Sequence, residues 1–123
     1  MNIIETKKAP AAIGPYSQAI TTGGLVFTSG QIPIDPASGS IAANDIAGQA
    51  RQAIQNLAAV LEAAGSGLDK VVKTICFLTD INDFAVFNEI YAQYFVGNPA
   101  RSCVAAKALP KGVLCEVELV AEV

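Results

Sequence analysis

Histidine is missing from this chain of 123 residues, and its absence removes several classes of site at once. A Ser-His-Asp triad, a Cys-His pair, a metal site with histidine ligands and a two-histidine nuclease mechanism are all excluded. Acid–base chemistry near pH 7 would therefore depend on carboxylates, tyrosine, lysine, cysteine or bound water.

Charge is also scarce. Charged residues form 15% of the sequence, hydrophobic residues form 52%, and the formal net charge is −3. The apolar content suffices for a core, but so few charges would leave apolar surface exposed on a monomer, which favours a homo-oligomer. The sequence has no run of lysine and arginine, so we expect no nucleic-acid partner.

The three cysteines, Cys76, Cys103 and Cys115, lack CxxC spacing. Their odd number argues against both a disulfide framework and a zinc site. The first eight residues lack the apolar core of a signal peptide. No apolar run approaches the roughly 20 residues that a membrane-spanning helix needs. We therefore expect a cytoplasmic protein without a membrane segment.

The predicted elements follow the order β-β-β-α-β-α-β-β, which makes residues 1–123 one domain of the α+β class. We expect the helices to cover one face of the sheet and to leave the other face for partner subunits or a ligand. Strands are predicted at 2–6, 16–21, 25–31, 71–78, 100–105 and 114–123. Helices are predicted from a cap at Asn44 or Asp45 to Gly65, and from a cap at Asp80 or Asp83 to Phe95.

Both helices show apolar residues at three- and four-residue spacing, which places them on one helical face. In the first helix this face comprises Ile46, Ala50, Ala53, Leu57, Val60, Leu61 and Ala64. The second helix carries an aromatic stripe that we interpret as core rather than as a ligand-binding surface: Phe84, Phe87, Tyr91, Tyr94 and Phe95.

Two strands have informative patterns. Residues 71–78 are rich in β-branched side chains and read as a strand buried on both faces. The final strand alternates, because successive side chains in a strand point to opposite faces. One set is apolar, namely Cys115, Val117, Leu119 and Ala121, and the other contains Glu116, Glu118, Val120 and Glu122. Cys76 and Cys115 are expected in the core.

Arg101 is one of only two arginines, and its neighbours in sequence are small or apolar. An unpaired guanidinium in such surroundings is costly, which indicates a specific anionic partner. Its planar fork can hold a carboxylate with two parallel hydrogen bonds. The partner could be the carboxylate of a small substrate or, equally, one of the eleven acidic side chains of the chain itself.

Further candidates are individually ambiguous. Glu116 and Glu118 could act as acid, base or water-positioning groups, or form a solvated strand edge. Tyr16 follows a Gly-Pro turn and could donate to a ligand or pack beneath its loop. Ser29 and Gly30 could meet a ligand through a hydroxyl and a close backbone approach, or mark a strand end.

Cys103 lies two residues after Arg101, so both face the same way on a strand. A nucleophilic thiol would need a lowered pKa, and no histidine can provide it. We therefore interpret Cys103 as a wall residue or a backbone contact.

These segments together resemble the RidA/YjgF family of reactive-intermediate deaminases over nearly the whole chain. The segments that carry the resemblance are Ala9–Ala19, Thr28–Pro33, Gln49–Gln52, Asp80–Phe84 with Asn88, Pro99–Val104, Leu109–Gly112 and Glu116–Glu118. Each segment is short, but their occurrence in this order is specific.

The resemblance implies a chorismate-mutase-like fold and a homotrimer, in which the sheets line a central barrel, the helices lie outside and each site lies at a subunit interface. It also implies hydrolysis of 2-imino acids, the tautomers of enamines such as 2-aminoacrylate, to 2-keto acids and ammonia. The family needs no cofactor or metal.

By motif, the resemblance implies that Arg101 binds the substrate carboxylate, that Glu116 orients or activates water and that Tyr16 supports the site. Ser29, Gly30 and Cys103 would line the pocket, and Phe84 and Asn88 would form its outer wall. One departure is the segment Val96-Gly97-Asn98, which is shorter than in many members of the family.

Two other functions fit the sequence less well. A non-catalytic module that binds small carboxylic acids such as 2-keto acids would share the fold, since fold does not determine function. A ribonuclease or translation inhibitor, a role ascribed to some members of the family, is disfavoured by the acidic balance and the absence of histidine.

Overall fold

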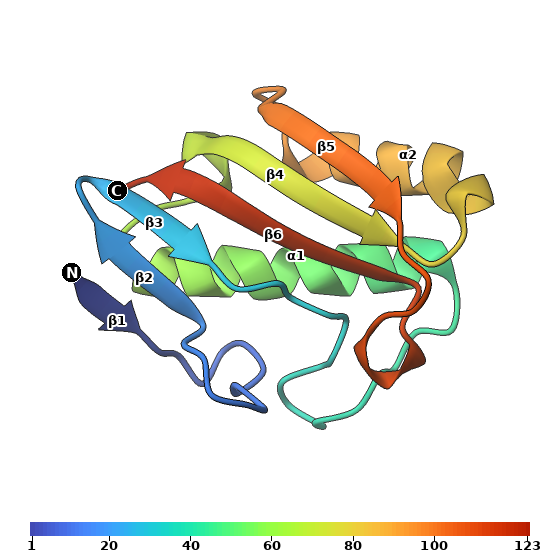
Figure 1. Cartoon of the computed structure of the whole chain (residues 1–123), viewed down its shortest axis with the longest axis horizontal. Helices are drawn as coiled ribbons and strands as arrows, with labels where there is room; N and C mark the ends of the chain where they lie inside the picture. Colours follow the sequence, from blue (N-terminus) through green and yellow to red (C-terminus); the bar gives the residue numbers. More distant parts are fainter.

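One six-stranded sheet carries two helices on a single face in the computed structural model, which describes residues 1–123 (Figure 1). The chain-order pattern β-β-β-α-β-α-β-β is confirmed. The strands are β1 (Asn2–Ile4), β2 (Ala19–Thr22), β3 (Leu25–Thr28), β4 (Val71–Leu78), β5 (Ala100–Ala105) and β6 (Cys115–Glu122), and the helices are α1 (Ile46–Ala63) and α2 (Phe84–Tyr94).

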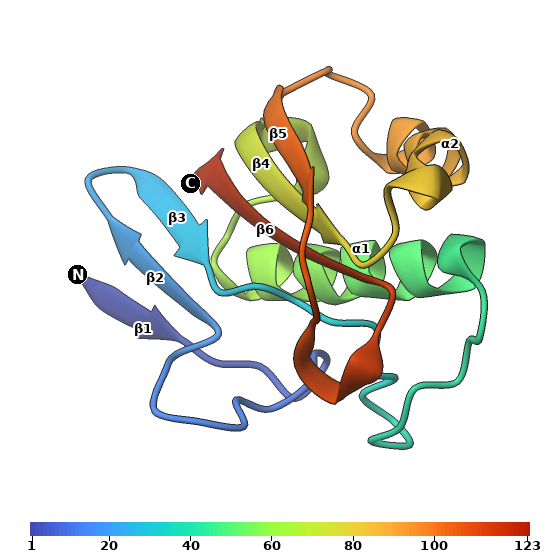
Figure 2. The same ribbon diagram turned by 45° about the vertical axis from the view of Figure 1, so that its right-hand side comes forward.

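The strands lie in the order β1-β2-β3-β6-β4-β5, so β1 and β5 form the two edges of the sheet. The pair β4 and β5 is parallel, and every other pair is antiparallel. The helix α2 connects the parallel pair, as a crossover must. Figure 2 shows α2 beside β4 and β5, near the sheet edge opposite β1.

Helix α1 begins and ends as its sequence predicts. The side chain of Asp45 accepts a hydrogen bond from the Gly48 amide at 3.2 Å, which caps the first turn. Gly65 adopts a positive φ of 79°, and the Ser66 amide reaches back to the Leu61 carbonyl at 2.8 Å. This arrangement is the Schellman ending, which favours glycine because other residues are strained there.

The main core lies between the helices and the sheet. It contains 19 buried residues, including most of the predicted apolar face of α1 and the inward set of β6. Cys76 and Cys115 are fully buried within it, and burial raises the pKa of each thiol to about 12. Both cysteines are therefore core residues, as predicted.

The opposite face of the sheet has no covering layer within this chain. Ile75 and Phe77 on β4 are only half-buried there, and Phe27 on β3 is 43% exposed. The prediction that residues 71–78 are buried on both faces is therefore wrong for the single chain. The apolar composition of this strand exceeds what one covered face requires, so the open face has the character of a contact surface.

The strands β2 and β3 are both shorter than predicted. β2 starts at Ala19 rather than at residue 16, since the buried Gln18 side chain bonds the backbone of Thr6, Ala9 and Pro10. β3 ends at Thr28, and Gln31 forms only an isolated bridge with Val117.

The second helix starts at Phe84, directly after Asp83, which is one of its two predicted caps. Asp80 accepts from the Asn82 amide at 2.9 Å and caps the short 3-10 turn Ile81–Asp83 that precedes α2. Asp83 makes no capping hydrogen bond. Neither helix combines the length and the hydrophobicity that crossing a membrane would require.

Candidate functional site

Arg101 lies on the edge strand β5 and is held by side chains of α2. Its Nη1 donates to Asn88 Oδ1 at 2.7 Å. Its guanidinium carbon lies 4.8 Å from the ring centroid of Tyr91 and 5.4 Å from that of Phe84. Both distances are within the range of cation–π attraction. One hydrogen bond and two aromatic faces thus fix the orientation of the guanidinium.

No acidic side chain pairs with Arg101. The structure contains one ion pair, between Lys8 and Glu62 at 3.8 Å, and it lies elsewhere. The interpretation of Arg101 as half of an internal salt bridge is therefore wrong. A guanidinium has five N–H donors, and in Arg101 only one of these donors has a protein partner. The other N–H donors of Arg101 can bind an external anion.

Tyr91 and Thr74 lie next to Arg101 and were not predicted as site residues. Tyr91 was assigned to the core stripe, and its hydroxyl bonds to Thr74 Oγ1 at 2.7 Å. Thr74 is fully buried and is the residue of β4 that pairs with Arg101. Burial raises the pKa of the Tyr91 phenol, which keeps it neutral. The sequence does contain a signal for this role of Tyr91, because the spacing of Phe84, Asn88 and Tyr91 places all three on one face of the helix.

We expect Tyr91→Leu to raise KM for a carboxylate substrate by roughly three- to thirtyfold, because it removes the ring beneath Arg101. Tyr91→Phe keeps the ring and should leave KM near the wild-type value, while losing the bond to Thr74 and some thermal stability. Steady-state kinetics and thermal unfolding of both variants test this. Equal KM changes in the two variants would show that the ring does not position Arg101.

Cys103 shares the helix-side face of β5 with Arg101 and pairs in register with Cys76. Its side chain is half-buried. Burial raises the pKa of this thiol, and the nearby Arg101 charge only partly opposes the rise. The thiol therefore stays protonated near neutral pH, which does not favour a nucleophilic role, and its place in a pocket wall stays a prediction.

A second group of predicted residues gathers where the segment after β3 meets the start of β6. Glu116 lies against Gly30, whose backbone runs beside β6 through the bridge of Gln31. Ser29 Oγ donates to the Ser17 carbonyl at 2.6 Å. The hydroxyl of Tyr16, a residue 47% exposed, accepts from the Ile13 amide at 3.2 Å. Both hydroxyls are thus partly engaged in holding their loops.

The carboxyl group of Glu116 has a raised pKa. Burial is the larger cause, and repulsion from the neighbouring Glu118 is the second. Both glutamates lie on the open face of the sheet, opposite Phe77 and Ile75 of β4. A carboxyl group whose pKa is raised toward neutrality is suited to accept a proton from water and return it.

Gly30→Ala is expected to displace the Glu116 carboxylate without unfolding the chain. A methyl group at residue 30 would lie 2.8 Å from Cδ of Glu116 and closer still to Oε2. Because a displacement of about 1 Å can lower a rate roughly 10²-fold, activity should fall by about that factor. Gly97→Ala is the control, since nothing lies within 4 Å of the added methyl group. Similar rates in both variants would contradict this placement of Glu116.

The two groups point to opposite faces of the sheet. Arg101 pairs with Thr74, which is buried on the helix side. Glu116 pairs with Phe77, an odd number of residues from Thr74 and hence on the open side. Arg101 has no influence on the pKa of Glu116. Within one chain, Glu116 therefore does not serve as the counter-charge of Arg101.

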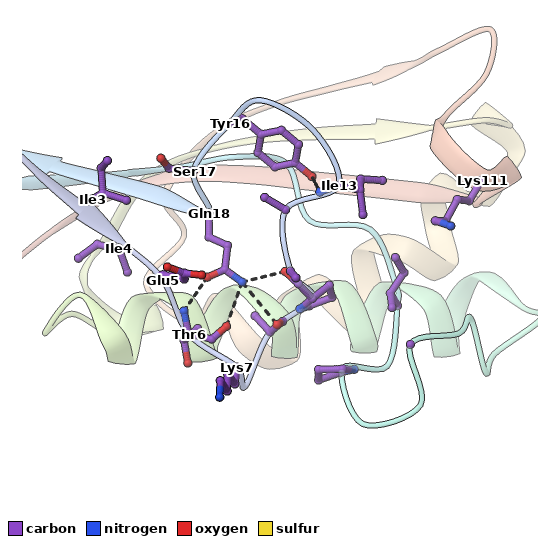
Figure 3. A pocket seen from close by; sticks show the side chains of 17 residues that line it. Ile3, Ile4, Glu5, Thr6, Lys7, Ile13, Tyr16, Ser17, Gln18 and Lys111 are labelled. Carbon is purple, nitrogen blue, oxygen red and sulfur yellow. Dashed lines mark hydrogen bonds between the residues drawn. The ribbon is translucent and has the colours of Figure 1, made fainter.

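Neither Arg101 nor Glu116 lines the hollow that lies beside the N-terminal loop. That hollow, of about 660 Å³, is bounded by the N-terminal loop and by Lys111, and it includes Tyr16 but not Arg101 or Glu116 (Figure 3). No three or more Cys, Asp or Glu side chains cluster as a metal site would require. The described geometry thus consists of two separate, partly buried groups of residues rather than one enclosed pocket.

Comparison with known proteins shows the family of the chain. The family model described as Endoribonuclease L-PSP matches residues 6–123. A structure of the Rid family protein YyfA from Yersinia pestis has a TM-score of 0.96 at 54% identity, and the match covers 99% of this chain and 98% of the other. The chain belongs to the RidA/YjgF family.

Other members of the RidA/YjgF family carry more specific names. The human 2-iminobutanoate/2-iminopropanoate deaminase is 50% identical over 120 residues, which cover 97% of this chain and 88% of the human protein. The structure of Escherichia coli TdcF with bound serine has a TM-score of 0.95 at 46% identity and covers 100% and 99% of the two chains. Some relatives of similar identity carry only the name RutC family protein.

Proposed function

We propose that this protein hydrolyses reactive 2-imino acids and their enamine tautomers, of the 2-iminopropanoate type, to 2-keto acids and ammonia. The observation that carries the proposal is the Arg101 guanidinium, which is oriented by α2 and has no acidic partner in the chain. The deaminase name of the human relative and the amino acid bound by TdcF support a small carboxylate substrate.

In the proposed reaction, Arg101 binds the substrate carboxylate through the donors that Asn88 leaves free. Glu116 orients a water molecule and accepts its proton as the oxygen bonds to C2 of the iminium form, while the C=N electron pair moves to nitrogen. Glu116 then returns that proton to the amino group of the carbinolamine, and the C–N bond breaks with its electron pair leaving on ammonia. The hydroxyl proton passes to Glu116 as the C=O bond forms, and ammonia carries it away as ammonium. Water is the only other reactant.

Orientation accounts for much of the acceleration. A free imine already reacts with water, so holding the water and C2 in contact lowers the barrier by several kcal/mol. The Glu116 carboxylate also stabilises the cationic iminium, which water attacks most readily. Ser29, Gly30 and Cys103 would line the pocket, and Phe84 and Asn88 would close its outer side.

Because Arg101 and Glu116 face opposite sides of one sheet, we propose that each site combines the Arg101 half of one copy with the Glu116 half of another. A homotrimer supplies three such sites through cyclic contacts. The uncovered apolar face, with Phe27, Ile75 and Phe77, is the surface that this assembly would bury. The three free cysteines fit the reducing cytoplasm, where we place the reaction.

The direct test is release of ammonia or 2-keto acid from freshly generated 2-iminopropanoate, with and without the protein. We expect faster hydrolysis in proportion to the protein added. Binding of a 2-keto acid, seen as a higher melting temperature, without any acceleration would instead favour a binding or sensing module.

A further inference from the structure

The hollow beside the N-terminal loop is too large for the proposed substrate. Its volume of about 660 Å³ lies within the roughly 300–1,000 Å³ typical of sites for drug-sized ligands. A three- or four-carbon imino acid would fill a small part of it. The lining includes neither Arg101 nor Glu116, and Tyr16 is the one residue that it shares with the proposed catalytic groups.

The walls of the hollow are largely apolar and are held in place by buried contacts. Ile4, Ile13, Ile34 and Pro36 contribute to its lining. Gln18, 3% exposed, ties the N-terminal loop together by accepting from the Thr6 amide at 2.7 Å and donating to the Pro10 carbonyl at 2.8 Å (Figure 3). The cavity is therefore built into the folded chain rather than opened by a loose loop.

Lys111 supplies an unpaired positive charge at one end. Its backbone has φ 58° and ψ 18°, a left-handed conformation that a lysine rarely adopts. Such strain tends to persist where a residue is held for a function. No carboxylate pairs with Lys111. In Figure 3 its side chain extends toward the hollow from the opposite side to the N-terminal loop.

The remaining charges on the lining offset each other. Glu5 and Lys7 both belong to it, carry opposite charges and lie two residues apart on the same loop. Lys111 therefore leaves the lining with one net positive charge. An apolar wall with a single cation at one end is complementary to a molecule with an apolar body and one anionic group.

We propose that this hollow is a second ligand site, which binds an amphipathic carboxylic acid with its chain along Ile13 and Ile34 and its carboxylate at Lys111 Nζ. Tyr16 also lines the hollow, and its hydroxyl bond to the Ile13 amide lies in the same wall. A bound acid would therefore contact a residue of the proposed catalytic half-site. The binding itself does not depend on the deaminase proposal.

The probe is octanoate, titrated into ¹⁵N-labelled protein below its micellar concentration. We expect amide shifts at Ile13, Tyr16 and Lys111, and octanamide, which lacks the charge, should bind about tenfold more weakly or worse. Lys111→Gln should weaken the binding of octanoate by a similar factor. Lys107→Gln is the matched control, since Lys107 is exposed and does not line the hollow.

Two more variants separate this site from the proposed catalytic one. Ile13→Asp places a negative charge in an exposed wall position and should weaken octanoate, whereas Arg101→Ala should leave its affinity unchanged even though imine hydrolysis is lost. Absence of octanoate binding, equal affinity of Lys111→Gln and wild type, or loss of binding in Arg101→Ala would each overturn the proposal.

Discussion

Arg101→Ala is expected to lower kcat/KM for 2-iminopropanoate by at least about 10²-fold, since it removes a charge-assisted, two-point contact with the substrate carboxylate. The fold should persist, because Arg101 makes one side-chain hydrogen bond and lies on an edge strand. Arg101→Lys should also be strongly impaired, because an ammonium group lacks the planar fork and stacks less well on Tyr91. Keto-acid release and thermal unfolding measure the two effects.

Arg51→Ala provides a matched control for this prediction. Arg51 is the other arginine of the chain, lies on α1 and bonds to Gln93 and Tyr94 rather than to any proposed site residue. Its removal makes the same change in net charge and should leave turnover close to wild type. Equal activity of Arg101→Ala and Arg51→Ala would remove the basis for placing the substrate carboxylate at Arg101.

Glu116→Gln is expected to lower kcat by roughly 10²- to 10⁴-fold, the range for loss of a general acid–base group. Its melting temperature near pH 7 should equal or exceed that of wild type. Burial raises the pKa of Glu116 in the folded chain, so the folded state holds this proton more tightly than the unfolded state. The free energy of unfolding therefore falls as pH rises through the unfolded-state and folded-state pKa values of Glu116. Glutamine does not ionise, so the variant avoids this loss of stability.

The same pKa shift predicts a pH dependence of the rate. If Glu116 acts as the base, the acid limb of the kcat/KM profile lies above the pH of an ordinary glutamate, because both causes raise its pKa. Glu118→Gln removes the second cause and should shift this limb to lower pH. A limb that does not move in Glu118→Gln, or full activity of Glu116→Gln, would contradict the assigned role.

Much of the fold follows from local patterns in the sequence. The start and end of α1 depend on Asp45 and Gly65, which act within one helical turn, and both were predicted correctly. The bounds of β5 and the alternation of β6 were also predicted, because one face of each strand meets the core or a helix. These features depend on residues that are close together in the sequence, so the sequence alone predicts them.

The arrangement of the site could not be predicted in this way. That Arg101 and Glu116 face opposite sides depends on the register of both strands with β4, which pairs residues far apart in sequence. The late start of β2 depends on contacts that the side chain of Gln18 makes across a loop. Tyr91 is buried in the core, as its stripe pattern predicts, but that pattern does not reveal Arg101 above its ring.

The most direct test of a site shared between copies is to mix two inactive variants. Arg101→Ala and Glu116→Gln would be co-expressed with different affinity tags, and assemblies containing both would be purified and assayed with 2-iminopropanoate. Every mixed cyclic trimer, whichever variant is in excess, has one of its three sites with both groups intact, so the purified mixed assemblies should show about a third of wild-type activity. Mixed assemblies no more active than either parent would contradict a site built from two chains.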